Sequence, residues 1–349
     1  MADGMTQMRV GIATFMNEIN YGALLQAYAL GAYIRSLGYS VCYINDAPAK
    51  HTAPRHPVKK LFYYLIAKNR IQNKQKVFSA FKDQHLQVID RADQVDILVC
   101  GSDQIWNVNI TGGFHPLFFG ELTEKNIAYA ASCGDVGVLE KDTETFGKLL
   151  GNFCAVSSRE KDLAAFVEKI SGKQCPVVCD PTFLLSPKAY GQIETPERLV
   201  KDDYLLIYQM NKASYLYTVA KEIARKKHLK IVEINNNMYD YTVRGHKRFY
   251  AGTIGDFLSL FRHASFVVTN SFHGTAFSLI YQKEFYVIKS KARNSRIVDL
   301  CGIAGLQDRV LENNQNIADL GDTSVSYAQV QENLMPLMEA SRQYLQTAL

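Results

Sequence analysis

The sequence predicts an α/β protein in which two doubly wound domains face each other over a ligand cleft. The chain has 349 residues, more than one ordinary domain of about 100 to 200 residues needs. Apolar residues make up 47% of it and charged residues 21%, which allows substantial cores to form. Strand-like runs alternate with helical patterns, and the alternation starts afresh after Cys179-Asp180-Pro181. Such alternation is typical of a mostly parallel sheet with helices on both faces.

The first domain, residues 1–186, is predicted from strand-like runs bounded by Gly, Ser, Asn or Asp, with helical patterns between several of them. These runs are Met8 to Thr14, Ser40 to Asn45, Val95 to Cys100, Asn126 to Ala131 and Ala155 to Ser158. Their pattern indicates a Rossmann-like sheet.

The second domain, residues 187–325, is predicted in the same way. Its strands are expected at Tyr204 to Gln209, Lys230 to Ile234, Phe266 to Asn270 and Phe285 to Ile288. Its helices are expected at Tyr215 to Lys227, Ile254 to Arg262 and Gly274 to Tyr281. No strand follows the last helical pattern, Ser326 to Thr347, so residues 326–349 are expected to pack back on the first domain. Ligands of such proteins bind at the carboxyl ends of the strands.

Several classes of function are not supported by the sequence. No apolar run reaches the ~20 residues that cross a bilayer, and no basic flank precedes a long apolar stretch at the N-terminus, so we expect a cytoplasmic protein. The seven cysteines are an odd number, and several, Cys154 among them, lie in or beside apolar runs, which favours buried, reduced thiols. Cys175 and Cys179 lack a second pair at zinc spacing, so no metal site is expected. Dinucleotide-binding glycine motifs, phosphate loops and Asp-x-Asp pairs are also absent from the sequence.

Positive charge is concentrated in one segment. The net charge is +5, and residues 50–82 hold nine Lys or Arg and no acidic residue. Wrapped around the apolar run Leu61 to Ala67, this charge could rest on an anionic membrane, at the inner face of the plasma membrane, or hold an anionic substrate. A solvated helical insertion is the plainer alternative. No nucleic-acid-binding motif accompanies the charge, so no nucleic-acid partner is expected.

The most informative segment for function runs from Ser265 to Ser278, where a buried strand turns into a helix. Such a turn presents backbone N–H groups and the positive end of a helix dipole, which suit a phosphate or carboxylate. His273 is the catalytic candidate, because an imidazole gains and loses a proton near neutral pH. A histidine that merely caps the turn is the alternative. The small or polar neighbours expected at the anion are Ser271, Gly274 and Thr275.

Arg159 is the cationic candidate of the first domain. It follows the strand-like run Ala155 to Ser158 and opens a helical pattern, so its guanidinium could bind a carboxylate or phosphate in bidentate fashion. As a surface residue paired with Glu160 or Asp162, it would carry no such role.

Two further strand-to-helix turns of the first domain carry polar candidates. Asp103 follows a buried strand and could act as a base or a sugar ligand. Trp106, the only tryptophan, could stack on a sugar ring or fill the core. Asn20 and Gly22 lie at the first helix start, where ordinary capping is the alternative.

Taken together, these residues resemble the polysaccharide pyruvyl transferase family. Six segments match in family order over most of the chain. They are Asn20-Tyr-Gly-Ala-Leu-Leu-Gln-Ala-Tyr28, Gly101-Ser-Asp-Gln-Ile-Trp-Asn107, Ser157-Ser-Arg-Glu160, Asp180-Pro-Thr-Phe-Leu-Leu185, Thr269-Asn-Ser-Phe-His-Gly274 and Arg293-Asn-Ser-Arg296. Any one of these segments is weak, but six in order are fairly specific.

The resemblance implies a glycosyltransferase-B-like pair of Rossmann-like domains. Its donor would be phosphoenolpyruvate, and its acceptor a sugar residue of a growing glycan, such as a lipid-linked oligosaccharide. The product would be a pyruvate ketal on two hydroxyls of one sugar, in a surface glycan such as an exopolysaccharide or capsule. Neither a redox cofactor nor an obligatory metal is implied, because the donor is itself activated.

The resemblance also implies roles for single residues. The family's histidine maps to His273, which would protonate the donor or bind its phosphate. The phosphoenolpyruvate-binding arginine maps to Arg159, and Asp103 would deprotonate the acceptor hydroxyl. The residues on the acceptor side would be Asn20, Gly22, Ser102 and Trp106.

One departure from the family concerns the donor site. Members often carry Arg-Leu-His-Gly where this chain has Ser271-Phe272-His273-Gly274, so one expected cation is missing. Lys291, Arg293 or Arg296, just downstream, could replace it.

Two other functions stay open from the sequence. A glycosyltransferase that uses a nucleotide sugar would have the same two-domain architecture, and a fold alone does not decide function. A non-catalytic glycan-binding protein could use the abundant tyrosine and phenylalanine as a sugar surface.

Overall fold

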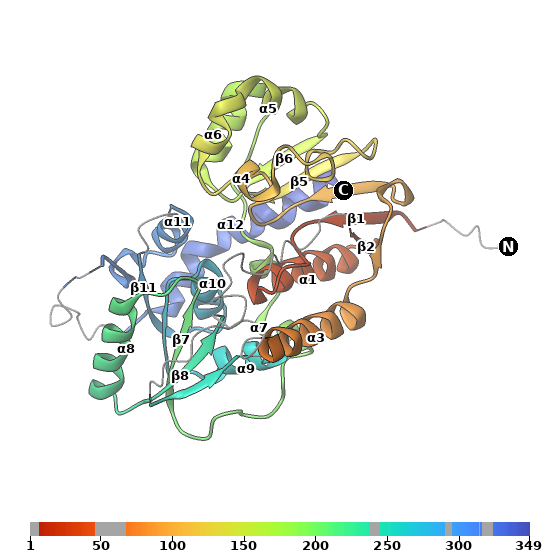
Figure 1. Ribbon diagram of the computed structural model, residues 1–349. Coiled ribbons are helices and arrows are strands. Elements are labelled where there is room, and N and C mark those ends of the chain that lie inside the picture. The colour runs from red at the N-terminus through yellow and green to blue at the C-terminus, as the bar shows by residue number, and fades with distance from the viewer. Residues whose placement is uncertain are drawn as a thin grey trace, which may run out of the picture. The chain divides into compact units, whose positions relative to one another are not determined.

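The computed structural model describes residues 7–45, 68–236, 245–250, 252–289, 295–313, 315 and 324–349. These residues divide into two α/β units (Figure 1). The first unit comprises the described residues of Met1–Pro48, Lys82–Leu185 and Leu334–Leu349, and the second those of Ala49–Phe81 and Ser186–Asn333. Arg293, Lys291 and the part of the basic segment from residue 50 to 67, with its apolar run, lie outside the described residues.

The first unit is built on a six-stranded parallel sheet in the order β3-β2-β1-β4-β5-β6. Its strands are β1 (Arg9–Ala13), β2 (Ser40–Ile44), β3 (Val88–Ile89), β4 (Ile97–Cys100), β5 (Asn126–Ala131) and β6 (Ala155–Ser158). The inner strands are buried on both faces and are therefore apolar almost throughout, which is why the sequence revealed them. The short edge strand β3 was not predicted.

Helices and 3₁₀ turns connect these strands. The helices are α1 (Tyr21–Ser36), α4 (Val108–Thr111), α5 (Thr143–Leu150) and α6 (Lys161–Ser171), and the 3₁₀ turns are η2 (Ala92–Gln94), η3 (Pro116–Phe119), η4 (Val136–Val138), η5 (Glu140–Asp142) and η6 (Pro181–Leu184). The last helix, α12 (Tyr327–Ala348), ends in this unit. There the Tyr344 hydroxyl donates to Ala128 O at 2.9 Å, and Ser341 Oγ accepts from Cys179 N at 2.8 Å.

The second unit has its own six-stranded parallel sheet, in the order β12-β11-β10-β7-β8-β9. Its strands are β7 (Tyr204–Gln209), β8 (Lys230–Asn235), β9 (Lys247–Phe249), β10 (Phe266–Thr269), β11 (Glu284–Ile288) and β12 (Val310–Leu311). Its helices are α7 (Pro187–Tyr190), α8 (Ser214–Lys226), α9 (Ile254–His263), α10 (Phe272–Ile280) and α11 (Ser295–Ile303), with the 3₁₀ turn η7 (Gln307–Arg309). Residues 68–81 of α3 (Lys68–His85) also belong here.

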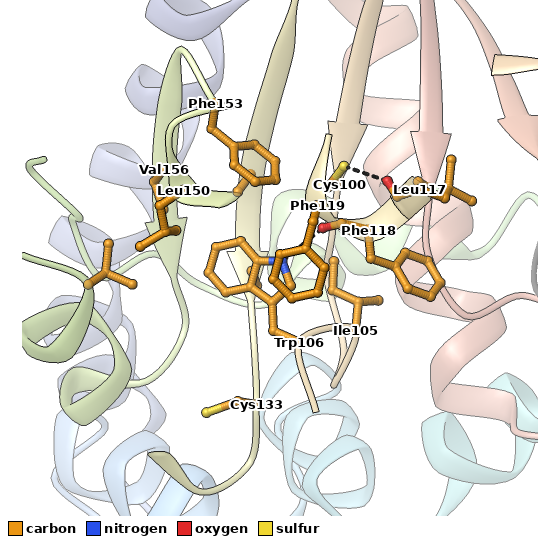
Figure 2. Close-up of a cluster of buried hydrophobic side chains, with 14 of the residues drawn as sticks. Cys100, Ile105, Trp106, Leu117, Phe118, Phe119, Cys133, Leu150, Phe153 and Val156 are labelled. Atoms are coloured by element: carbon orange, nitrogen blue, oxygen red, sulfur yellow. Dashed lines mark hydrogen bonds between the residues drawn. The ribbon is translucent and has the colours of Figure 1, made fainter. Parts of the chain in front are cut away.

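The core of the first unit surrounds Trp106 (Figure 2). Its ring is fully buried, stacks on Phe119 at 5.9 Å between centroids, and meets Phe146 and Phe153 edge-on. The indole Nε1 donates to Phe118 O at 2.9 Å, so the polar atom of the ring is satisfied inside the core. Trp106 has no face for a sugar, and the expectation that it binds the acceptor is corrected.

The cysteines follow the predicted pattern with one exception. None forms a disulfide, and six of the seven are buried. Cys154 is exposed, because it stands just before β6, where the chain enters the sheet from the surface. The expectation that Cys154 is a buried thiol is therefore wrong. No described group of three or more His, Cys, Asp or Glu side chains could hold a metal ion. Within the described residues, no helix is both long and apolar enough to cross a bilayer.

Candidate functional site

His273 lies in the first turn of α10, directly after β10, at the carboxyl edge of the second sheet. Ser271 is the N-cap of this helix: its Oγ accepts from Gly274 N at 3.3 Å, and its carbonyl oxygen accepts from Thr275 N at 3.0 Å. Thr269 Oγ1 accepts from Ser271 N at 3.0 Å and donates to Tyr208 O at 2.6 Å. Hydrogen bonds to β10 and β7 therefore fix the turn that carries His273.

Gly274 lets α10 start directly against these strands. A Cβ atom at this position would lie 2.2 Å from Thr269 Oγ1 and 3.1 Å from Tyr208 Cδ1. Contacts below 3.0 Å require the backbone or its neighbour to shift, so no larger residue fits this turn as it stands. Glycine at position 274 therefore has a packing role that the sequence did not reveal.

The surroundings of His273 combine burial with positive charge. The residue is 7% exposed, and its ring meets that of Phe272 edge-on at 5.4 Å between centroids. Arg296 Cζ lies 5.8 Å from the centroid of the Phe272 ring. Arg296 is one of the downstream cations expected near this turn, and the structure places it beside the residue that precedes His273. The positive dipole end of α10 adds to the field there.

Three residues that the sequence analysis did not identify lie at the same edge of the second sheet. Asn236 follows β8, and its Nδ2 donates to Gln209 O, at the end of β7, at 3.3 Å. Lys74 of α3 donates from Nζ to Asn236 Oδ1 at 2.9 Å. Tyr208, of β7, is fully buried under the start of α10. Lys74 shares one helix face with Phe78 and Phe81, at the spacing i, i+4, i+7, and this spacing is the signal that could have revealed its burial.

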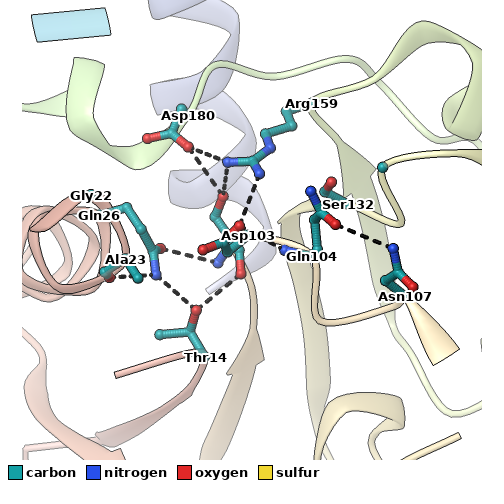
Figure 3. Close-up of polar contacts among 12 residues, drawn as sticks. Thr14, Gly22, Ala23, Gln26, Asp103, Gln104, Asn107, Ser132, Arg159 and Asp180 are labelled. Atoms are coloured by element: carbon teal, nitrogen blue, oxygen red, sulfur yellow. Dashed lines mark hydrogen bonds and ion pairs between the residues drawn. The ribbon is translucent and has the colours of Figure 1, made fainter. Parts of the chain in front are cut away.

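Arg159 is the centre of a polar network in the first unit (Figure 3). Its NH1 donates to Asp180 Oδ2 at 2.5 Å and to Ser102 Oγ at 3.3 Å, and its NH2 donates to Asp103 Oδ1 at 3.2 Å. The side chain is 2% exposed. Burial disfavours the charged form, but the carboxylates of Asp180 and Asp103 outweigh it and raise the pKa of Arg159 above its ordinary value. The guanidinium is neither the surface cation nor the open ligand contact that the sequence suggested.

Asp103 stands in an unusual backbone conformation at this network. Its φ is 68°, in the left-handed region that residues other than glycine rarely adopt. Its Oδ1 accepts from Arg159 and from Gln104 N at 2.9 Å. Glu18, on the loop before α1, is a further carboxylate that the sequence analysis missed. Partial desolvation, and then the charge of Asp103, raise the pKa of Glu18, so the two acids influence each other.

Of the remaining acceptor-side candidates, Ser102 and Gly22 are buried and Asn20 is half-buried. Ser102 is fully buried: its amide donates to Gln26 Oε1 at 3.4 Å, and its carbonyl accepts from Thr14 Oγ1 at 2.9 Å. Asn20 caps α1, with Oδ1 accepting from Gly22 N at 3.0 Å. Ser102 supports the loops of the first unit from a buried position, and the amide of Gly22 is bonded within the cap of α1, which corrects the expectation that these two residues contact an acceptor. That Asn20 does so stays a prediction.

The chain was compared with known proteins. The family model described as "Polysaccharide pyruvyl transferase" matches residues 20–291, a range that includes Arg159, Asp103 and His273. No curated protein matches the chain.

Solved structures share the fold at low sequence identity. A UDP-N-acetylglucosamine 2-epimerase has a TM-score of 0.54 at 10% identity, over 97% of this chain and 94% of that one. A putative UDP-N-acetylglucosamine 2-epimerase from Listeria monocytogenes has a TM-score of 0.52 at 10% identity, over 98% and 91%. MnaA from S. aureus, in a co-structure with UDP, has a TM-score of 0.50 at 10% identity, over 98% and 91%. The predicted glycosyltransferase-B-like α/β fold is confirmed.

The family model spans more than half of the chain and includes both polar edges described above. The chain belongs to the polysaccharide pyruvyl transferase family, a family of transferases.

Proposed function

We propose that this transferase moves the pyruvyl group of phosphoenolpyruvate to a sugar residue of a surface glycan and closes it there as a ketal. The observation that carries the proposal is the position of His273, buried in the first turn of α10 at the carboxyl edge of a parallel sheet. A helix start of this kind attracts the anionic groups of the donor. The family supplies the reaction class.

His273 would act as the general acid of the first step. It gives a proton to the methylene carbon of phosphoenolpyruvate, which becomes a methyl group and leaves an oxocarbenium-like cation at C2. A sugar hydroxyl attacks C2 and loses its proton, and the C2–O bond to phosphate breaks. A second hydroxyl of the same sugar then attacks C2 and closes the ketal, and the departing phosphate takes up the proton of this second hydroxyl. The positive dipole end of α10 and the nearby Arg296 favour the departing phosphate.

Asp103 would accept the proton of the attacking hydroxyl, and Arg159 would hold the carboxylate of Asp103 in place. Asp103 Oδ1 is engaged by Arg159 and Gln104, and no hydrogen bond from a described residue reaches Oδ2. Arg159 is thus proposed as a positioning residue, in place of the donor-binding role that the family resemblance suggested. Glu18, with its raised pKa, is a neighbouring acid that can exchange the same proton.

The test is a transfer assay with phosphoenolpyruvate and a panel of oligosaccharides. It would follow phosphate release and the gain of a ketal-linked pyruvyl group by mass spectrometry. His273→Ala should lower the rate by ~10² to 10⁴, the usual contribution of a general acid. His228→Asn is the matched control, because His228 is exposed at the end of α8. A folded His273→Ala variant with wild-type turnover would refute the role of this histidine.

A nucleotide-sugar reaction is the second candidate, because the similar solved structures include a protein in a co-structure with UDP and a putative UDP-N-acetylglucosamine 2-epimerase. Thermal stabilisation separates the two proposals. A ligand at a hundredfold excess over its Kd stabilises the folded state by about 2.7 kcal/mol. We expect that shift with phosphoenolpyruvate. A shift with UDP-sugars alone would favour the nucleotide-sugar reaction, and a shift with oligosaccharides alone would favour a glycan-binding protein.

A further inference from the structure

Lys74 is a buried lysine at the carboxyl edge of the second sheet. It lies on α3, is 1% exposed, and donates from Nζ to Asn236 Oδ1 at 2.9 Å. Its Nζ also lies 5.8 Å from the centroid of the Phe78 ring. Lysine is almost never fully buried unless something compensates its charge. Lys74 therefore brings a positively charged group to this edge of the sheet.

Tyr208 brings a buried hydroxyl to the same place. Its side chain is fully buried and faces Asn236 and Ser271, the N-cap of α10. Burial raises the pKa of Tyr208 to about 12, so the hydroxyl keeps its proton at neutral pH. The hydroxyl nevertheless makes no hydrogen bond of normal geometry to any residue that the structure describes. A buried hydroxyl without a hydrogen-bond partner destabilises the fold unless a ligand or a water molecule accepts from it.

We propose that Lys74, Tyr208 and the N-terminus of α10 form a phosphate-binding subsite within the second unit. Lys74 supplies a positively charged donor, and Tyr208 supplies a neutral donor. Asn236 orients the ammonium. The identification of the bound phosphate with the phosphate of the donor rests on the proposed function. The subsite itself is inferred from these contacts alone.

The charge of Lys74 suits this role. Burial lowers its pKa to about 7, and an anion bound beside the ammonium would favour its charged form. Lysine binds phosphate as a compact point charge, and the dipole end of α10 acts in the same direction. A lysine that only filled space against Phe78 and Phe81 would be replaceable by methionine without effect on anion binding.

The experiment measures the binding of inorganic phosphate and of phosphoenolpyruvate by isothermal titration calorimetry. Lys74→Met keeps the length and most of the volume of the side chain and removes the charge. Lys76→Met is the matched control, because Lys76 is exposed on the same helix. Tyr208→Phe removes only an oxygen atom and leaves the packing against Phe257 and Phe261, so it tests the subsite even if the Lys74 variant folds poorly.

We expect Lys74→Met to weaken phosphate binding by roughly 10- to 100-fold, as the loss of a charged hydrogen bond does. Tyr208→Phe should weaken it by about 5- to 10-fold, and Lys76→Met should bind as the wild type does. Equal phosphate affinity in the wild type and both site variants would overturn the subsite, and so would a wild type that binds no phosphate at millimolar concentration. If phosphate binding depends on Lys74 but the wild type transfers no pyruvyl group, the subsite stands and the proposed function fails.

Discussion

Arg159 and His273 show how much the environment of a single residue decides. Both follow a buried parallel strand at a strand-to-helix turn, and both are almost fully buried. Arg159 forms ion pairs with Asp103 and Asp180 of its own unit, so its charge stabilises a loop. His273 stands instead in the first turn of α10, with Arg296 beside the neighbouring Phe272. The same local pattern in the sequence therefore leads to a proposed positioning residue in one unit and a proposed acid in the other.

Gly274→Ala should destabilise the second unit, because its new methyl group would meet Thr269 Oγ1 at 2.2 Å. We expect a loss of about 1 to 3 kcal/mol in the free energy of unfolding, as for other overpacked sites. Urea denaturation would measure it, and transfer activity should fall as well, because the turn carries His273. Gly302→Ala is the control: Gly302 lies in α11 with no described atom within 4 Å of its Cβ position. That change should be neutral or stabilise by up to about 1 kcal/mol, and equal effects of the two variants would contradict the argument.

At the scale of elements, the strands of four or more residues were predictable, the edge strand β6 among them, and the three shorter edge strands were not. Strands such as β4 and β10 are buried on both faces, so their sequences are continuous apolar runs. The edge strands β3, β9 and β12 have two or three residues each, too few to form a pattern. Lys74 and Asn236 stand 162 positions apart, so no local pattern could join them. Trp106 carried the right chemistry for a sugar site, but its burial depends on Phe119, Phe146 and Phe153, which only the fold brings together.

Glu233 joins three elements of the second unit and should give that unit a specific sensitivity to acid. Its Oε2 accepts from His246 Nε2 and Arg248 Nε, on or beside β9, at 2.9 Å each. Its Oε1 accepts from the Tyr217 hydroxyl of α8 at 2.5 Å. Burial alone would raise the pKa of Glu233, but hydrogen bonds from His246, Tyr217 and Arg248 lower it to about 2.

Because the folded-state pKa of Glu233 lies below the ordinary value of 4.5, its stabilising contribution is present above about pH 4.5 and is lost as the pH falls towards about 2. Glu233→Gln should cost about 3 to 5 kcal/mol at pH 7, as the loss of one partner of a buried pair does. It should also flatten the fall in stability between about pH 5 and pH 2. Urea midpoints at a series of pH values would show both effects. A parallel fall in the variant and the wild type would mean that other carboxylates carry the acid sensitivity.

At the scale of the whole molecule, the two units have separate cores, and the chain need not unfold in one step. The positions of the cysteines allow stepwise unfolding to be measured. All seven are free, and only Cys154 is exposed. Five buried thiols lie in the first unit, and Cys301 alone lies in the second. Burial raises the pKa of Cys175 and Cys301 to about 12 and that of Cys179 to about 11, so these thiols are both shielded and protonated at neutral pH.

A thiol reagent should therefore modify one cysteine rapidly in the native chain and all seven in denaturant, and Cys154→Ser should remove the rapid reaction. The slow reactions follow unfolding, because a buried thiol reacts only when its core opens. Pulse labelling across a urea series, read by mass spectrometry, would give one midpoint for Cys301 and one for the thiols of the first unit. If the two cores unfold separately, the two groups of thiols should have different urea midpoints. Inorganic phosphate should raise the midpoint of Cys301 more than the midpoint of the thiols in the first unit, because the proposed subsite lies wholly in the second unit. Coincident midpoints that move together with phosphate would mean that the two units unfold as one cooperative structure.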